Sequence, residues 1–285
     1  MQRTDFRCFH RLRVRWAEVD MQKIVFNAHY LMYIDTAMMD YWRALALPYE
    51  ASMVALGGDI YVKKATLEYH ASAQLEDLLE VGLRCARVGN SSLLMQAGIF
   101  RGEQLLVSGE LVYVFADPAT QTSRPVPEAL RAIFTAYEAC EAMAHAHCGA
   151  WDALGPDAAR VRHAVFIQEQ GIPADIEVDE LDATAVHVVL RNRLGMPVAT
   201  GRLLQHAPGE GRIGRMAVER ALRGGGWGRQ VLRALEDAAR ARGDQRVLLH
   251  AQVQARAFYE RVGYHVHGEP WMEAGIPHIA MQRAL

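Results

Sequence analysis

The sequence predicts an α+β protein of two domains. At 285 residues the chain is longer than one small core usually organises. Residues 27–45 are apolar around most of a helix and are followed by four strand-like runs, as in an antiparallel sheet that encloses a helix. Farther along, a glycine-rich loop stands between a strand and a helix, as in a mixed α/β domain that binds an anion. We expect domains at 1–138 and 152–285, joined by a linker at 139–151.

The first domain begins with a strand at 11–16, where arginines alternate with Leu12, Val14 and Trp16. Asn27 is then expected to cap the long helix. Four further runs have the composition of strands, and short turns between them suit antiparallel hairpins; the runs are 60–70, 78–88, 93–100 and 105–115. A buried helix wrapped by an antiparallel sheet is the hotdog fold.

Motifs in this half resemble the 4-hydroxybenzoyl-CoA thioesterase family of hotdog proteins. The segment 20–30 (DMQKIVFNAHY) is similar to the signature D-x-x-G-x-V-[YFW]-x-x-x-Y, and 87–92 (RVGNSS) and 124–127 (RPVP) add support. The resemblance covers about residues 6–138. It implies a thioester site at a subunit boundary, in a homodimer or homotetramer held together by this domain.

The resemblance assigns Asp20 to activating water or attacking the thioester, while backbone N–H groups of Asn27 and Ala28 polarise the carbonyl. Out of this context, Asp20 would simply close a turn before the helix. Lys23 stands where the family has glycine, so the loop is strained or reshaped if that position requires positive φ. We expect His29 to be a helix-face contact and Glu18 a solvated strand residue.

The joining segment 126–151 starts as a helix and continues into Ala- and His-rich sequence, which we interpret as a linker helix. Two cysteines and two histidines near its end lack the Cys-x-x-Cys pattern of zinc sites, so no metal is expected; they are Cys140, His145, His147 and Cys148.

The second domain contains a strand at 212–218, a glycine-rich loop at 223–228, a helix at 228–242 and a strand at 246–252. Glycines at a helix N-terminus let backbone N–H groups approach an anion, so a pyrophosphate is the expected ligand. A plain surface turn would also be glycine-rich. The spacing matches neither G-x-G-x-x-G nor Gly-Lys-Ser/Thr.

The loop resembles the R-x-x-G-x-G pyrophosphate loop of the GNAT superfamily of N-acetyltransferases. The segment 255–264 (ARAFYERVGY) is similar to that family's A-x-x-F-Y-x-x-x-G-F segment. The resemblance covers about residues 150–285 and implies acyl transfer from acetyl-CoA or another acyl-CoA to an amine. It assigns three groups of residues to the cofactor. The loop contributes Arg223, Gly224, Gly225, Gly226, Trp227, Gly228 and Arg229, and the end of the preceding strand contributes Met216, Ala217 and Val218. The third group is Gln252, which replaces the family's usual asparagine.

By the same resemblance, Tyr259 protonates the departing CoA thiolate. A phenol suits this role because its ordinary pKa is close to that of the thiol. As an alternative, Tyr259 is a core aromatic beside Phe258. Glu169 and His250 are the candidate general bases, the first of them lying in 166–173 (FIQEQGIP).

That segment, together with 273–278 (EAGIPH), resembles the bacterial ElaA-like subgroup of GNAT proteins. The carboxylates that follow the first segment would favour a cationic acceptor, unless they form a solvated loop; they are Asp175, Glu177, Asp179, Glu180 and Asp182.

Composition narrows the class of function. A net charge of −2 does not favour nucleic-acid binding, and no apolar run is long enough to span a bilayer. Four cysteines without a pairing pattern suit a reducing compartment, so we expect a cytoplasmic protein. We interpret the chain as a bifunctional enzyme, a thioesterase followed by an N-acetyltransferase. The alternative is an acetyltransferase whose hotdog half binds acyl-CoA and oligomerises without hydrolysis.

Overall fold

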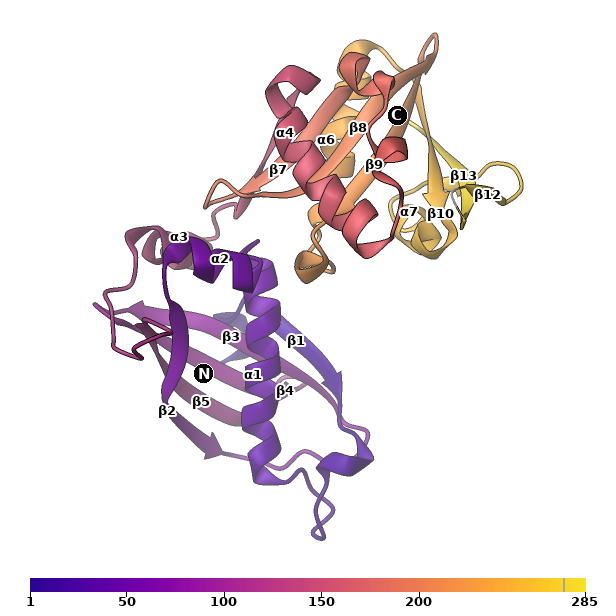
Figure 1. Ribbon diagram of the computed structural model, residues 1–285. Coiled ribbons are helices and arrows are strands. Elements are labelled where there is room, and N and C mark those ends of the chain that lie inside the picture. Colours follow the sequence, from indigo (N-terminus) through magenta and orange to yellow (C-terminus); the bar gives the residue numbers. More distant parts are fainter. Residues whose placement is uncertain (274) are drawn as a thin grey trace. The chain divides into compact units, whose positions relative to one another are not determined.

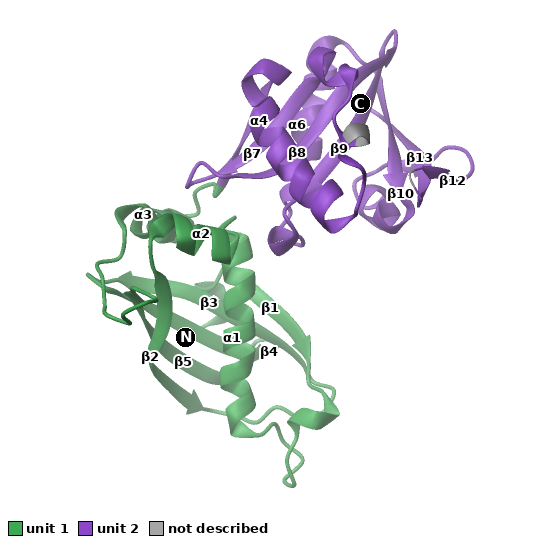
Figure 2. Cartoon of the chain, viewed as in Figure 1, with its two compact units in different colours: residues 1–143 green, residues 144–285 purple. Residues whose placement is uncertain are grey.

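A computed structural model describes residues 1–273 and 275–285, without the side chains of residues 175 and 176. The Asp175 side chain and Ala274, both within segments singled out above, therefore lie outside the described residues. The chain forms two compact units, Met1–Met143 and Ala144–Leu285 (Figure 2).

The first unit is a five-stranded sheet with one long helix on its face (Figure 1). Neighbouring strands are all antiparallel, in the order β1-β3-β4-β5-β2. The helix α1 spans Asn27–Ala44, and the predicted hotdog fold is confirmed. The strands are β1 (Cys8–Arg13), β2 (Asp59–Tyr69), β3 (Leu78–Val88), β4 (Ser92–Arg101) and β5 (Gln104–Ala116).

Helix α1 buries one face and leaves another exposed. Its buried residues follow helical spacing, because a single sheet can cover only one side of a helix; they are Tyr30, Tyr33, Ile34, Ala37, Met38, Tyr41 and Trp42. Leu31, Met32 and Met39 remain exposed. The prediction that Asn27 caps this helix is wrong, because Phe26 holds the N-cap position and has no side-chain acceptor.

Three short elements of this unit do not follow from the hydrophobic pattern that predicts the strands. They are the helix α2 (Tyr49–Leu56) and the 3₁₀ turns η1 (Arg3–Asp5) and η2 (Trp16–Glu18). The predicted helix after the last strand is present as α3 (Glu128–Glu138). Its Phe134 stacks on Tyr41 with ring centroids 5.7 Å apart, which ties α3 to α1.

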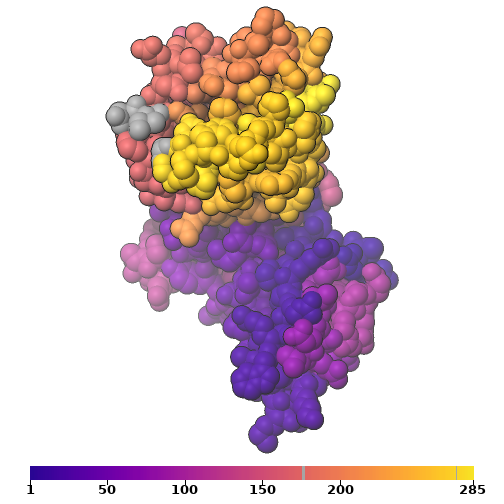
Figure 3. Space-filling view, turned by 90° about the vertical axis from the view of Figure 1, so that its right-hand side faces the viewer, coloured from indigo at the N-terminus to yellow at the C-terminus, as the bar shows by residue number. Residues whose placement is uncertain are grey.

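The second unit is built on a sheet ordered β11-β13-β10-β9-β8-β7-β6, with β12 paired to β13. Helices α4 and α6 pack on it, and the C-terminal strands, yellow in Figure 3, lie at its surface. The strands are β6 (Ala144–Gly149), β7 (Val186–Asn192), β8 (Pro197–Ala207), β9 (Glu210–Val218), β10 (Arg246–Gln252), β11 (His265–Val266), β12 (Trp271–Glu273) and β13 (Ile276–Ala284).

The remaining elements of this unit are helical, and they are α4 (Trp151–Arg162), the π-helical η3 (His163–Glu169), α5 (Ala174–Glu177), η4 (Glu180–Thr184), η5 (Arg220–Leu222), α6 (Trp227–Arg242), η6 (Val253–Ala255) and α7 (Arg256–Glu260). The proposed linker at 139–151 needs correction, because residues 144–149 are strand β6 paired with β7. An edge strand that alternates short apolar and polar residues lacks the strong pattern that would reveal it.

One pair of strands in this sheet separates along its length. β9 and β10 are parallel, and they pair only from Glu210 to Ile213 and from Arg246 to Leu249. A bulge lies just beyond, where Arg215 has the left-handed φ of +50° and the β8–β9 register shifts. Bulges bend a strand and increase its twist, so β9 turns away from β10 at this point.

Candidate active sites

The glycine-rich loop ends at the N-terminus of α6, as the sequence predicts. Gly224 and Gly226 both have φ of +87°, a conformation that a residue with a Cβ adopts only under strain. Gly226 is the N-cap of α6, so the N–H groups at the start of the helix point out of the helix end toward the loop. Such a turn binds anions such as pyrophosphate.

A cavity of about 790 Å³ runs along this loop. Every residue that the GNAT resemblance assigns to the cofactor lines it, from the end of β9 through the loop to Gln252. Three further lining residues lie outside the segments quoted above, and they are Val165, Leu222 and Gln254. β10 has separated from β9 before this point, so β10 forms no backbone pairing with Met216–Val218. The arrangement can hold an extended thioester along β9.

Arg223 anchors the loop through two interactions. Its Nε donates to the carbonyl of Val218 at 3.1 Å, and its two terminal nitrogens donate to the Glu169 carboxylate at 2.6 and 2.7 Å. These hydrogen bonds hold the pKa of Glu169 below its ordinary value. A carboxylate that is paired in this way is a poor proton acceptor, so the geometry disfavours Glu169 as the general base.

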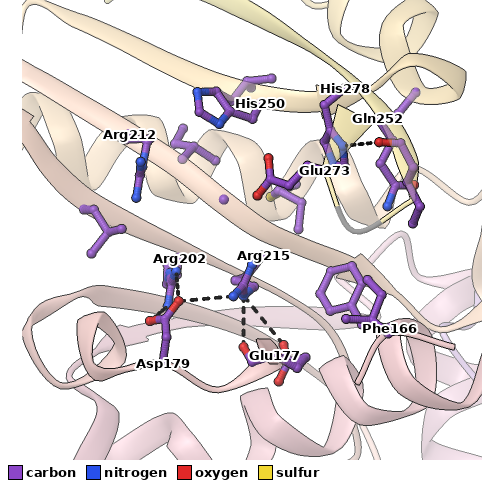
Figure 4. A pocket seen from close by; sticks show the side chains of 18 of the residues that line it. Phe166, Glu177, Asp179, Arg202, Arg212, Arg215, His250, Gln252, Glu273 and His278 are labelled. Carbon is purple, nitrogen blue, oxygen red and sulfur yellow. Dashed lines mark hydrogen bonds and ion pairs between the residues drawn. The ribbon is translucent and has the colours of Figure 1, made fainter. Parts of the chain in front are cut away.

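A second cavity, of about 330 Å³, lies where β9 and β10 separate (Figure 4). Figure 4 shows His250, Glu273 and His278 on one side of it and Glu177, Asp179, Arg202 and Arg215 on the other. The two cavities share five wall residues, which makes them neighbouring compartments; these are Gln170, Met216, Gln252, Ala255 and Tyr259.

Tyr259 lies in the core of its unit and at the wall of both cavities. Its ring packs against Phe258 and Tyr264, with centroids 4.9 and 5.8 Å away, as a core aromatic would. It also lines both cavities. Burial raises the pKa of the phenol, so the hydroxyl keeps its proton at neutral pH, but it is a weaker acid than the match with a thiol pKa expected from the sequence.

His250 is the candidate base that faces the second cavity. Burial lowers the pKa of its imidazole, and the positive charge of Arg212 lowers it further. The ring lies edge-on to Trp271 with centroids 4.7 Å apart. A histidine that is neutral at pH 7 can accept a proton from an attacking amine.

The acidic segment is neither a free anionic patch nor a solvated loop over most of its length, and both expectations need correction. Glu177 and Asp182 are 2% exposed. The fully buried Arg162 donates to both of them, and Arg202 donates to Asp182 at 2.7 Å and to Asp179 at 2.6 Å. Burial opposes ionisation of Asp182, but these hydrogen bonds lower its pKa to about 2.

Arg215 completes this network by donating to Asp179 at 3.1 Å. Three arginines therefore neutralise three carboxylates. Among the acidic side chains of this segment that the structure describes, only Glu180 is exposed. Arginines at the cavity could not be assigned from the sequence, because arginines in strands usually face solvent.

In the first unit, the loop of Asp20 forms a tight turn. One carboxylate oxygen of Asp20 accepts the N–H of Gln22 at 2.8 Å, so the turn-closing role is present. Lys23 has the left-handed φ of +63°, so the strain expected for a lysine at the family's glycine position is confirmed. Asn27 and Ala28 lie exposed in the first turn of α1, where N–H groups have no intrahelical acceptor.

The prediction that Glu18 is solvated is wrong. Glu18 is 2% exposed and accepts hydrogen bonds from Arg15 and from the Tyr33 hydroxyl, the latter at 2.8 Å. Burial alone would raise its pKa, but these donors hold it below its ordinary value. Its partner Tyr33 lies 15 residues away on α1, so the sequence pattern of the first strand could not reveal this contact. His29 contacts Phe26, as expected for a helix-face residue.

The described residues contain neither a metal-binding cluster nor a membrane-spanning helix. No three His, Cys, Asp or Glu side chains among them gather closely enough to hold a metal ion. No helix in the described part of the chain has the length and apolar character needed to cross a membrane.

Comparison with known proteins divides the chain in the same way. Residues 156–285 match the family model of the acetyltransferase (GNAT) domain, and residues 22–108 match that of the thioesterase superfamily. The chain is 39% identical over 128 residues to the uncharacterised N-acetyltransferase YjcF of Bacillus subtilis, a match that covers 45% of this chain and 90% of YjcF.

Two further matches cover one half of the chain each. The chain is 27% identical over 124 residues to the acyl-CoA thioester hydrolase YbgC of Escherichia coli, which covers 43% of this chain and 92% of YbgC. The solved structure of Escherichia coli ElaA is 28% identical, with a TM-score of 0.45, and the match covers 50% of this chain and 99% of ElaA.

Proposed function

The second half of this chain belongs to the GNAT acetyltransferases and the first half to the thioesterase superfamily, and on that premise we propose that the second unit transfers an acetyl group from acetyl-CoA to an amine. One observation carries the proposal. Tyr259 is a wall of both the cavity along the glycine-rich loop and the cavity where β9 and β10 separate. A thioester in the first cavity and an amine in the second would meet at this residue.

The proposed reaction divides its steps among residues of both cavities. The loop at the start of α6 binds the pyrophosphate of CoA, and the backbone of Met216–Val218 holds the pantetheine and polarises the thioester carbonyl. The amine nitrogen forms a bond to the carbonyl carbon while His250 accepts its proton. The C–S bond then breaks, and Tyr259 donates its proton to the departing CoA thiolate.

The test is a balance of products. Acetyl-CoA is incubated with the full chain and a panel of primary amines, and free thiol and N-acetyl product are measured separately. Transfer predicts equal amounts of the two, and thiol release only when an amine is present. Thiol release without N-acetyl product would contradict the proposal.

For the first unit we infer thioester hydrolysis at Asp20, with the non-hydrolytic acyl-CoA-binding module as the second candidate. Fold and motif support hydrolysis, since the Asp20 carboxylate lies partly exposed one short loop before the start of α1. The left-handed φ of Lys23 and the hydrogen bond that Asp20 accepts from Gln22 favour the second candidate, because a non-glycine residue is strained there and the Asp20 carboxylate already closes the turn. Thiol release from a panel of acyl-CoAs without amine separates these, with Gly228→Asp to silence the second unit.

We also infer that the first unit holds the chain in a homodimer or homotetramer. The exposed apolar residues Leu31, Met32 and Met39 of α1, together with Tyr61 and Val62 on the edge strand β2, form surface that a second copy would bury. Light scattering on the full chain measures the assembly, and Met32→Glu together with Met39→Glu should reduce its mass.

The four cysteines are unpaired, which suits a reducing compartment, and we therefore propose that the protein lies in the cytoplasm.

A further inference from the structure

One cation in the second cavity has no protein partner. The other arginines of this wall, Arg202 and Arg215, are held by carboxylates. Arg212 is half-buried and lines the same cavity, yet none of the described residues forms a hydrogen bond or ion pair with its guanidinium. A partly desolvated guanidinium in a binding cavity is the group that proteins use to bind carboxylates and phosphates.

The sheet register places this cation beside the proposed base. Arg212 of β9 pairs with Leu248 of β10, and His250 follows two residues later on the same strand. Since side chains alternate between faces of a sheet, Arg212, Leu248 and His250 lie on one face. Burial lowers the pKa of the His250 imidazole, the positive charge of Arg212 lowers it further, and the charge of Glu273 acts in the opposite direction.

An unpaired anion faces the same cavity from another strand. Glu273 of β12 is exposed, and it has no hydrogen-bond or ion-pair partner among residues 1–273 and 275–285. In Figure 4 it lies near His278, on the side of the cavity that also carries His250. The cavity therefore presents one cation and one carboxylate around a neutral imidazole, because the acidic segment is already neutralised by arginines.

We propose that the amine acceptor is a small molecule that carries its own carboxylate, an amino-acid-like compound whose carboxylate binds Arg212. This rests on the proposed acetyl transfer. Arg212 holds the acid group by charge-assisted hydrogen bonds, and Glu273 attracts the ammonium form of the amine. The ammonium loses one proton to solvent, and His250 accepts the second proton as the neutral amine attacks. A cavity of about 330 Å³ suits a small acceptor. Diamines and polyamines lack the group that Arg212 requires.

The test compares acids with their amides. The probes are glycine, L-leucine and 4-aminobutanoate, each with its carboxamide, and 1,4-diaminobutane as the dication. Calorimetry measures their binding to the full chain saturated with CoA, and a parallel assay measures N-acetyl product from acetyl-CoA. The variants are Arg212→Gln, which removes the charge, and Arg212→Lys, which keeps it. Arg233→Gln, an exposed arginine of α6, is the matched control.

At least one carboxylate should bind the wild type about 10- to 100-fold more tightly than its carboxamide. Arg212→Gln should abolish that difference by weakening the acid alone, Arg212→Lys should keep part of it, and Arg233→Gln should keep all of it. The proposal is overturned if no acid binds better than its amide, if the preference survives in Arg212→Gln, or if the diamine binds best. Preferential binding without any N-acetyl product would instead contradict the proposed transfer, so the two failures are distinct.

Discussion

Replacing Gly228 with aspartate tests the pyrophosphate site by charge alone. Gly228 lies in the first turn of α6 and does not have positive φ. A Cβ added there would lie 3.4 Å from a Val218 methyl and 3.6 Å from the Phe258 ring, which is ordinary contact. The backbone therefore accepts a side chain at this position, unlike Gly224 and Gly226, where φ is +87°.

The expected loss of affinity follows from Coulomb's law. Two like unit charges about 4 Å apart repel by about 1 kcal/mol in water and by about 4 kcal/mol near a protein surface. A pyrophosphate carries two such charges, so the aspartate at position 228 should cost at least about 2 kcal/mol. This corresponds to roughly 30-fold weaker acetyl-CoA binding, and the upper value of about 8 kcal/mol corresponds to about 10⁶-fold, which would abolish measurable binding.

The stability of the second unit should not fall. A carboxylate in the first turn of a helix interacts favourably with the helix dipole, by about 0.3–1 kcal/mol. Calorimetric binding of acetyl-CoA and thermal unfolding are measured on the same preparation, with Gly228→Asn as the uncharged control of equal size. If the asparagine variant loses as much affinity as the aspartate variant, bulk explains the effect. Wild-type affinity in the aspartate variant would refute the pyrophosphate site.

Four further outcomes are expected. Tyr259→Phe should lower turnover of acetyl transfer about 10- to 10³-fold with little change in acetyl-CoA affinity, because only the proton donor is lost. With His250 as the base, kcat/KM for acetyl-CoA at saturating amine should show an acid limb below the ordinary histidine pKa, because burial and Arg212 depress the pKa of this ring, and His250→Gln should remove that limb. Asp20→Asn should cut thioester hydrolysis about 10²-fold or more while keeping an acceptor for the Gln22 N–H. Lys23→Gly should raise the free energy of unfolding of the first unit by about 0.5–1 kcal/mol. Glycine removes about 1–2 kcal/mol of left-handed strain from the folded loop, but it also loses about 0.5–1 kcal/mol more conformational entropy on folding.

Each of these has an outcome that contradicts it. Loss of cofactor affinity with normal turnover would make Tyr259 a binding residue. An unchanged acid limb in His250→Gln would assign the base elsewhere. Full hydrolysis by the Asp20→Asn variant would remove that carboxylate from catalysis. An unchanged or lower melting temperature of the first unit in Lys23→Gly would mean that the loop does not hold strain at that residue.

The sequence predicted what depends on local pattern. Helix α1, strands β2 to β5 of the first unit and the strand–loop–helix of the second follow from periodicity and from glycine placement, which act over a few residues. The strand expected at 11–16 instead lies at Cys8–Arg13, and Trp16 begins a 3₁₀ turn. The residues expected to hold the cofactor in the second unit line one cavity, because the loop and the end of β9 are neighbours in sequence. Their roles in binding remain predictions.

Features that depend on distant partners were missed. The acidic segment could not be interpreted because its partners Arg162 and Arg202 each lie 20 residues from Asp182 in sequence. Glu18 was misjudged for a related reason, since Tyr33 of α1 reaches it only in the folded unit. Strand β6 has a weak pattern of its own and is defined by pairing with β7.

The buried network of Arg162, Arg202 and Asp182 restricts how this chain can vary. Losing one member of a buried ion pair leaves an uncompensated charge, whereas replacing the whole set with well-packed apolar residues can be neutral. Single substitutions at these positions should therefore be rare among related chains, and the three should change together. When related sequences are aligned, correlated replacement of Asp182 with Arg162 or Arg202 would mark chains that keep the same fold around a different acceptor cavity.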